Sequence, residues 1–348
     1  MSDRVCIFHI GTHKTGTTSL QVFLQENFFA LQAAGVHVAQ AGRFPLVSTN
    51  DLAGASPGNH ELAWDLVADG HSELDELVRE FSQVTANCAV VSSEDFSLLY
   101  ARPEMLESLD AALRSAGWQT KIVVYLRPQA AYAESMYVER VKHGHVRPIA
   151  SYLRTILDEG RYLPEGTRQD IAFSYPRLVE PFARVFGRGN VAVRAYAPKE
   201  QTDIFRDFLS VVEAFYPAIG AQHLKLVVSR PRENESLSFG QLLWTLHAAL
   251  RPADAASLDP QRFLPEFAPE ITGDLATSRF ALLRRDEHRA MLERFAEENA
   301  QIARDYGALV PFTAEADVPP QDHPVWEKVR IERAVFDRCL QAWATAPV

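Results

Sequence analysis

The sequence predicts an α/β protein in which a doubly wound parallel sheet is flanked by helices and followed by a helical C-terminal extension. Short, near-continuous apolar runs recur in the first half of the chain. Stretches with helical periodicity alternate with these runs, and helical periodicity dominates from residue 201 onward. Strands that alternate with helices imply βαβ units and a parallel sheet. We expect one domain over 1–348, with an α/β core in 1–238 and a mainly helical extension in 239–348.

The predicted strands are short apolar segments, namely Val5–Ile10, Cys88–Ser92, Lys121–Leu126 and Asn190–Tyr196. The first three are near-continuous rather than alternating, which is typical of strands that are covered on both faces. Gly35–Ala39 is expected to form a fifth strand, at an edge of the same sheet.

Three helices are predicted from apolar spacing and from the residues that begin or end them. Apolar side chains at three- and four-residue steps predict one amphipathic helix over 18–33. A second helix is predicted to begin at Pro103 and to end at Gly117. Met291 and Phe295 share one face of a long, charged helix near the C-terminus.

Composition and charge narrow the function classes. The 348 residues are 47% hydrophobic and 23% charged, with 45 acidic and 35 basic side chains and a net charge of -10. This charge disfavours bulk nucleic-acid binding but allows a local site for a small anion. Three separated cysteines exclude a disulfide scaffold and a CxxC zinc site, and they fit a reducing compartment. With no signal peptide and no long apolar run, we expect a cytoplasmic protein without a membrane span. The oligomeric state is not encoded in any pattern.

The segment 10–20, IGTHKTGTTSL, follows a predicted strand and opens a predicted helix. Its backbone N–H groups and hydroxyls, together with the positive end of the helix, favour an anion site. Gly11 and Gly16 have the spacing of the glycines in a nucleotide P-loop, so we expect a P-loop-like fold. Position 17, however, is Thr where a P-loop has lysine, and the lysine of this segment stands earlier, at Lys14. The candidate ligands are Lys14, Thr15, Gly16, Thr17, Thr18 and Ser19. The alternative is an ordinary βα turn in which Thr15 or Thr17 caps the helix.

A second candidate anion site follows the predicted strand over Lys121–Leu126. Arg127 projects at the carboxyl end of that strand, where open α/β sheets bind ligands. Ser135 lies eight residues later in the helix that follows. A guanidinium group and a hydroxyl could share one phosphate there, whereas the alternative is a solvated arginine and a serine on the helix surface.

Together, the two segments resemble the sulfotransferases that use 3′-phosphoadenosine 5′-phosphosulfate (PAPS). The K-x-G-T-T/S-x-L loop of that family, which holds the 5′-phosphosulfate, is matched by Lys14, Gly16, Thr17, Thr18 and Leu20. The R-x7-S element, which holds the 3′-phosphate, is matched by Arg127 and Ser135, although the asparagine of the usual R-N-P is missing. The resemblance covers residues 5–140 well and is looser to about 240. It implies PAPS as donor and 3′,5′-ADP as product, and no metal is expected.

The resemblance also suggests weaker candidates. Tyr175 matches an aromatic residue near the adenine, and Arg230 or Arg232 falls where the family has an arginine loop over the 3′-phosphate. The segment SSEDFS and the NESL pattern are most similar to bacterial carbohydrate sulfotransferases. The expected partners are therefore a small-molecule donor and a hydroxylated acceptor, such as a glycan or glycolipid.

Lys14 is the leading catalytic candidate, because a lysine stabilises charge that develops as the donor bond breaks. The acceptor hydroxyl needs a general base, for which we favour Glu94 and keep His60 as the rival. The alternative for Glu94 is a purely structural role, as a carboxylate that caps a helix. Two other functions stay open, a P-loop-type nucleotide kinase and a non-catalytic nucleotide-binding protein of the same fold. A kinase of this type would have a lysine at position 17, where this chain has Thr. A non-catalytic protein would be expected to lack Lys14 or both candidate bases, but all of them are present.

Overall fold

The structure is a computed structural model that describes residues 4–43, 57–196, 203–220, 224, 226–228, 237–257, 260–277, 280–307 and 318–345. The chain divides into two compact units. The first comprises Met1–Arg127, Glu165–Pro231 and Glu298–Val310, and the second comprises Pro128–Pro164, Arg232–Glu297 and Pro311–Val348. The segment 128–164 lies in the second unit, and the predicted single domain with a core over 1–238 stays a prediction.

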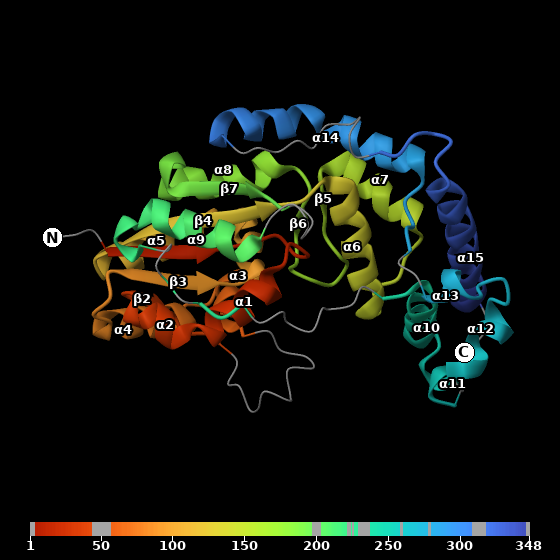
Figure 1. Cartoon of the computed structure of the whole chain (residues 1–348), viewed down its shortest axis with the longest axis horizontal. Helices are drawn as coiled ribbons and strands as arrows, with labels where there is room; N and C mark the ends of the chain where they lie inside the picture. Colours follow the sequence, from red (N-terminus) through yellow and green to blue (C-terminus); the bar gives the residue numbers. More distant parts are fainter. Residues whose placement is uncertain are drawn as a thin grey trace. The chain divides into compact units, whose positions relative to one another are not determined.

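Within the described residues, a five-stranded sheet forms the centre of the first unit (Figure 1). Its strands, in spatial order, are β2 (Val36–Val38), β3 (Cys88–Ser92), β1 (Arg4–His9), β4 (Trp118–Leu126) and β7 (Val191–Ala195). All neighbouring pairs are parallel. The predicted parallel sheet is therefore confirmed, including the edge strand after Gly35.

Helices cover both faces of this sheet. They are α1 (Thr17–Glu26), α2 (Phe28–Ala33), α3 (His60–Val67), α4 (Ser72–Gln83), α5 (Pro103–Ser115), α8 (Tyr175–Phe186) and α9 (Ile204–Phe215). Shorter elements are η1 (Glu94–Ala101), η2 (Arg188–Asn190), η3 (Pro217–Ile219) and strand β6 (Ile171–Ala172). Leu20 and Phe23 of α1 and Phe208 of α9 join Ile7 and Val90 in the buried core on one face. Helices α5 and α8 pack against β4.

The single helix predicted over 18–33 is wrong, because the helix is broken at Asn27. The Asn27 side chain is buried, and its Nδ2 donates to the carbonyl oxygens of Phe23 and Val227, each at 2.8 Å. Its Oδ1 accepts from the N–H of Val227 at 2.7 Å. Asn27 thus satisfies the carboxyl end of α1 and fixes a segment from far along the chain. Such a tertiary role leaves no periodic signal.

The second unit is helical. Its elements are α6 (Gln129–Lys142), α7 (Ile149–Glu159), β5 (Arg161–Tyr162), α10 (Phe239–Leu250), α11 (Pro252–Ser257), α12 (Pro260–Phe267), α13 (Asp274–Thr277) and α15 (Val325–Thr345). The long helix α14 (Arg285–Tyr306) begins in this unit and ends in the first. Met291 and Phe295 are buried on it, as predicted. The regular elements among the described residues of 239–348 are all helices.

The order of the strands places a topological switch between β1 and β4. The chain leaves β1 toward β2 and β3 on one side, and after β3 it crosses β1 to reach β4 and then β7. In open α/β sheets, ligands bind outside the carboxyl ends of the strands at such a point. The turns that follow β1 and β4 carry Lys14 and Arg127.

Candidate functional site

The turn between β1 and α1 adopts a backbone that few sequences tolerate. Gly11, Lys14 and Gly16 have φ values of 32°, 67° and 79°. Glycine enters this left-handed region readily, whereas lysine does so at a cost of about 1–2 kcal/mol. Gly16 is also tightly packed, because a Cβ there would lie 3.1 Å from Ile204 Cδ1. Strain at a non-glycine residue in such a turn is typical of functional sites.

The threonine hydroxyls of this turn divide into two groups. Thr12 Oγ1 donates to the carbonyl oxygen of Tyr125 at 3.0 Å, and Thr15 Oγ1 donates to that of Thr12 at 2.6 Å. These two buried hydroxyls therefore hold the turn together. Thr17 Oγ1 is also buried, but it has no hydrogen-bond partner among the described residues. Thr18 and Ser19 are half-buried in the first turn of α1.

Gly11 packs closely against this unsatisfied hydroxyl. A Cβ added to Gly11 would lie 2.8 Å from Thr17 Oγ1. The first turn of α1 carries no acidic residue, so its N–H groups present positive potential undiminished by a local carboxylate. A hydroxyl without a partner, a glycine packed against it and a helix N-terminus together fit a bound anion.

Arg127, the first residue of the second predicted anion site, contacts the turn between β1 and α1. It follows β4, and its Nη1 donates to the carbonyl oxygen of Lys14 at 3.2 Å. Tyr175, the first residue of α8, donates its hydroxyl to the carbonyl oxygen of Arg127. The Tyr175 ring is fully buried, so stacking on adenine would require that the ring become exposed.

Three further donor ligands were predicted from the sequence. Ser135 lies on α6 in the second unit. Arg230 and Arg232 lie outside the described residues. The roles of all three stay predictions.

A buried carboxylate, Asp95, gathers polar side chains beside the turn. His60 Nδ1 lies 2.9 Å from Asp95 Oδ2, and His13 Nε2 lies 3.2 Å from Oδ1. Trp64 Nε1 donates to Oδ2 at 2.9 Å. Ser93 Oγ lies 3.0 Å from His60 Nδ1 and accepts the N–H of Asp95. One carboxylate therefore organises residues from the β1 turn, from α3 and from η1.

The charges in this Asp95 cluster are mutually stabilising. Burial disfavours the Asp95 carboxylate, but hydrogen bonds from His13 and His60 outweigh it and hold the pKa of Asp95 well below its usual range. Burial likewise lowers the pKa of His60 and Arg43 adds to that effect, but Asp95 and Glu94 outweigh both, so the His60 pKa lies above its usual value. With Nδ1 held by Asp95, the neutral His60 ring carries its lone pair on Nε2.

Glu94 is the first residue of η1, directly after the capping residue Ser93. Its Oε2 accepts from Gln21 Nε2 of α1 at 3.3 Å, and its side chain is half-buried. The structure thus places both predicted bases near the β1 turn, with Glu94 beside α1 and His60 in the Asp95 cluster.

His9, by contrast, is a core residue. It lies 2.9 Å from Ser92 Oγ through Nδ1, and burial lowers its pKa to about 3.

Sequence reasoning did not select Asp95, His13 or Trp64 as site residues. Trp64 had a signal, because it lies four residues after His60 and so on the same helix face. The signal for Asp95 was weak, because Glu94 and Asp95 both follow Ser93 and the sequence does not show which carboxylate points into the protein.

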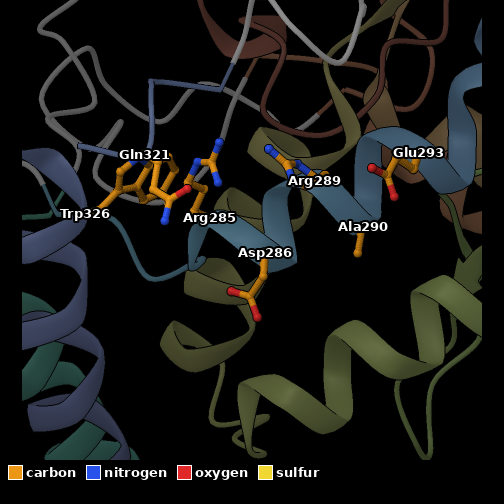
Figure 2. A pocket seen from close by; sticks show the side chains of 7 residues that line it. All are labelled: Arg285, Asp286, Arg289, Ala290, Glu293, Gln321 and Trp326. Atoms are coloured by element: carbon orange, nitrogen blue, oxygen red, sulfur yellow. The ribbon is translucent and has the colours of Figure 1, made fainter. Parts of the chain in front are cut away.

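A cavity of about 440 Å³ lies in the second unit (Figure 2). Its lining residues are Arg285, Asp286, Arg289, Ala290, Glu293, Gln321 and Trp326. Figure 2 shows Asp286 pointing away from Arg285 and Arg289. The lining mixes both charges and shares no residue with the site predicted from sequence, so it defines no ligand class.

Comparisons with known proteins add little. No family model and no curated protein matches the chain. A solved structure described as a sulfotransferase from Alicyclobacillus acidocaldarius is similar over 76% of this chain and 96% of that one, with 18% sequence identity and a TM-score of 0.38. A likeness at this level does not assign an activity.

Across the described part of the chain, no helix is long and apolar enough to span a bilayer. The same residues contain no cluster of three or more His, Cys, Asp or Glu suited to a metal ion.

Proposed function

We propose that the protein is a sulfotransferase that moves the sulfuryl group of PAPS to a hydroxyl acceptor. The observation that carries this proposal is the hydrogen bond from Arg127 Nη1 to the carbonyl oxygen of Lys14. It joins the two motifs that resemble the PAPS-dependent enzymes, and it does so at the switch between β1 and β4, where this sheet class binds ligands.

The β1 turn supplies the groups that a phosphosulfate needs. PAPS, when bound, supplies the sulfuryl group and a phosphate leaving group. The first N–H groups of α1 and the Thr17 hydroxyl would hold its 5′-phosphate, in a P-loop-like manner. Lys14 would stabilise the charge that grows on the leaving oxygen, and Arg127 would bind the 3′-phosphate. Ser135 completes the second motif as a prediction from the sequence.

We favour His60 over Glu94 as the base. Asp95 fixes the His60 tautomer through Nδ1, which leaves Nε2 as the basic atom. The raised His60 pKa makes that atom a stronger base. Asp95 is then a positioning residue, because it acts through His60. Glu94, beside α1, stays the alternative base.

An exposed aromatic ring supports a carbohydrate acceptor. Trp64 is 46% exposed although its Nε1 is fixed on Asp95, and its ring centroid lies 5.9 Å from that of His60. A fixed indole face with a polar anchor is suited to stacking against the apolar face of a sugar. A sugar on Trp64 would bring its hydroxyls close to His60.

Transfer of radiolabelled sulfate from PAPS to a glycan acceptor tests the proposal. The wild-type protein is expected to label the acceptor without added metal, and Lys14→Ala is expected to abolish labelling. Phosphate transfer from ATP-Mg in place of sulfate transfer would favour the kinase alternative. Neither transfer, with tight nucleotide binding, would favour the non-catalytic one.

A further inference from the structure

We propose that Arg43 binds an anionic group, a carboxylate or a phosphate, carried by the acceptor, so that the substrate is an acidic sugar derivative. The identity of the ligand as acceptor rests on the proposed function, whereas anion binding by Arg43 does not. Arg43 follows β2 in the first unit and was not a candidate from the sequence.

The Arg43 guanidinium is buried with unused donors. Its Nη1 donates to Gln25 Oε1 of α1 at 2.6 Å, a neutral acceptor. Its Nε and Nη2 are buried, and within the described residues neither has a hydrogen-bond partner. Burial lowers the pKa of Arg43 to about 10, and Glu80 opposes this effect. A buried cation with two unpaired donors is costly, unless a ligand supplies the missing acceptors.

Glu80 is the carboxylate that acts on Arg43, but its oxygens are already used. Glu80 Oε1 lies 2.5 Å from His37 Nε2 and accepts the N–H of Gln40 at 2.9 Å. Its Oε2 accepts the N–H of Ala41 at 2.8 Å. Glu80 therefore holds the end of β2, and over the described residues Arg43 forms no ion pair within 4.0 Å.

Backbone contacts place Gly42, the residue before Arg43, against the first turn of α3, which carries His60. The carbonyl oxygen of Gly42 accepts the N–H of Glu61 at 3.0 Å, in the first turn of α3 that begins with His60. A Cβ on Gly42 would lie only 2.4 Å from the backbone nitrogen of Leu62, so this packing requires glycine. Arg43 is close enough that its charge lowers the pKa of His60.

This proximity couples the anion to the base. The charges that act on His60 are those of Asp95, Glu94 and Arg43, and only Arg43 opposes protonation. An anion on Arg43 would offset that charge and make His60 more basic. The planar guanidinium fork, with Nε and Nη2 side by side, matches the paired oxygens of a carboxylate or phosphate.

Titration of the His60 ring by NMR tests the anion site without any donor. The probes are methyl glucuronide, glucose 6-phosphate and the neutral methyl glucoside. Both acidic probes, or one of them, are expected to raise the His60 pKa in the wild type, and the neutral probe is not. Arg43→Gln should weaken binding of the acidic probe about tenfold or more. Arg79→Gln, an exposed arginine of the same unit, is the matched control and should change nothing.

Preference for one acidic probe identifies the anion as carboxylate or phosphate. Equal response to all three probes, or the same response in Arg43→Gln, overturns the proposal.

Thermal unfolding of Arg43→Met separates binding from folding. Because Arg43 is an underpaired buried cation, its replacement should leave the melting temperature unchanged or raise it. A clear fall would show a structural role and contradict the proposal. If 3′,5′-ADP does not bind but the anion effect persists, the proposed function fails and the anion site stands.

Discussion

Asp95 accepts a hydrogen bond from His60, with 2.9 Å between Oδ2 and Nδ1, inside a cluster that also includes His13 and Trp64. The pair links η1, which follows β3, to the start of α3. Each partner stabilises the charged form of the other, so the pKa of Asp95 is lowered and that of His60 is raised. The same contact therefore contributes to stability and sets the basicity of the proposed base.

Asp95→Asn is expected to destabilise the fold most in mildly acidic solution. Asp95 has a lowered pKa, so its contribution is present above its unfolded value of about 3.9 and is lost as pH falls. His60 has a raised pKa, so its contribution is present below its unfolded value of about 6.5 and is lost as pH rises through the folded value. Urea unfolding should show a loss of about 3 kcal/mol near pH 5.5 and a smaller one near pH 8.5.

The matched control is Glu76→Gln, which removes an exposed carboxylate paired with Arg79 on α4. Its cost should stay below about 1 kcal/mol at both pH values. An Asp95→Asn variant with a cost independent of pH would show that the two charges are not coupled.

Lys14 is expected to show opposite effects on stability and turnover. Its φ of 67° favours glycine, so Lys14→Gly should be about 1 kcal/mol more stable than Lys14→Ala in denaturant unfolding. Both variants should lower turnover more than they weaken 3′,5′-ADP binding, because the lysine acts on charge that develops during transfer. Unchanged turnover with weakened binding would remove Lys14 from catalysis.

The two candidate bases are separated by conservative variants. His60→Gln should reduce transfer to a sugar hydroxyl by about 10²–10⁴-fold while 3′,5′-ADP affinity is retained. Glu94→Gln keeps the shape of the side chain beside Gln21 and should remain largely active. An inactive Glu94→Gln with an active His60→Gln would return the role of base to Glu94.

Tyr175→Phe tests how the buried tyrosine affects the donor site. The variant loses the hydrogen bond to the Arg127 carbonyl oxygen and should cost about 1 kcal/mol of stability. Since that bond positions Arg127, calorimetry should show weaker binding of 3′,5′-ADP and little change for 5′-AMP. Equal losses for both nucleotides would instead indicate a contact with adenine.

The sheet was predictable because its signals are local. Strands such as Cys88–Ser92 are apolar runs bounded by polar residues, and their alternation with helices implies parallel pairing. The break at Asn27 was not predictable, since it depends on a contact with Val227, 200 residues away. The division into two units depends on the same kind of distant packing.

The candidate site was selected where the order of residues along the chain carries a signal. The glycines and hydroxyls of the β1 turn and the arginine after β4 have such an order, and their roles as ligands stay predictions. Asp95 and Arg43 were missed because their importance lies in burial and in the partners that they have or lack. Neither property can be read from a residue and its neighbours in sequence.

Calorimetry of 3′,5′-ADP and 5′-AMP, without metal, tests the central claim most directly. The account predicts that 3′,5′-ADP binds clearly more tightly, that added salt weakens its binding, and that Arg127→Ala reduces its affinity about tenfold or more while 5′-AMP changes little. The hydrogen bond from Arg127 to Lys14 brings together one residue of each proposed anion site, so under the proposal both phosphates should contribute. Equal affinity for the two nucleotides would mean that the 3′-phosphate is not recognised, and would contradict the proposal of a PAPS-dependent sulfotransferase.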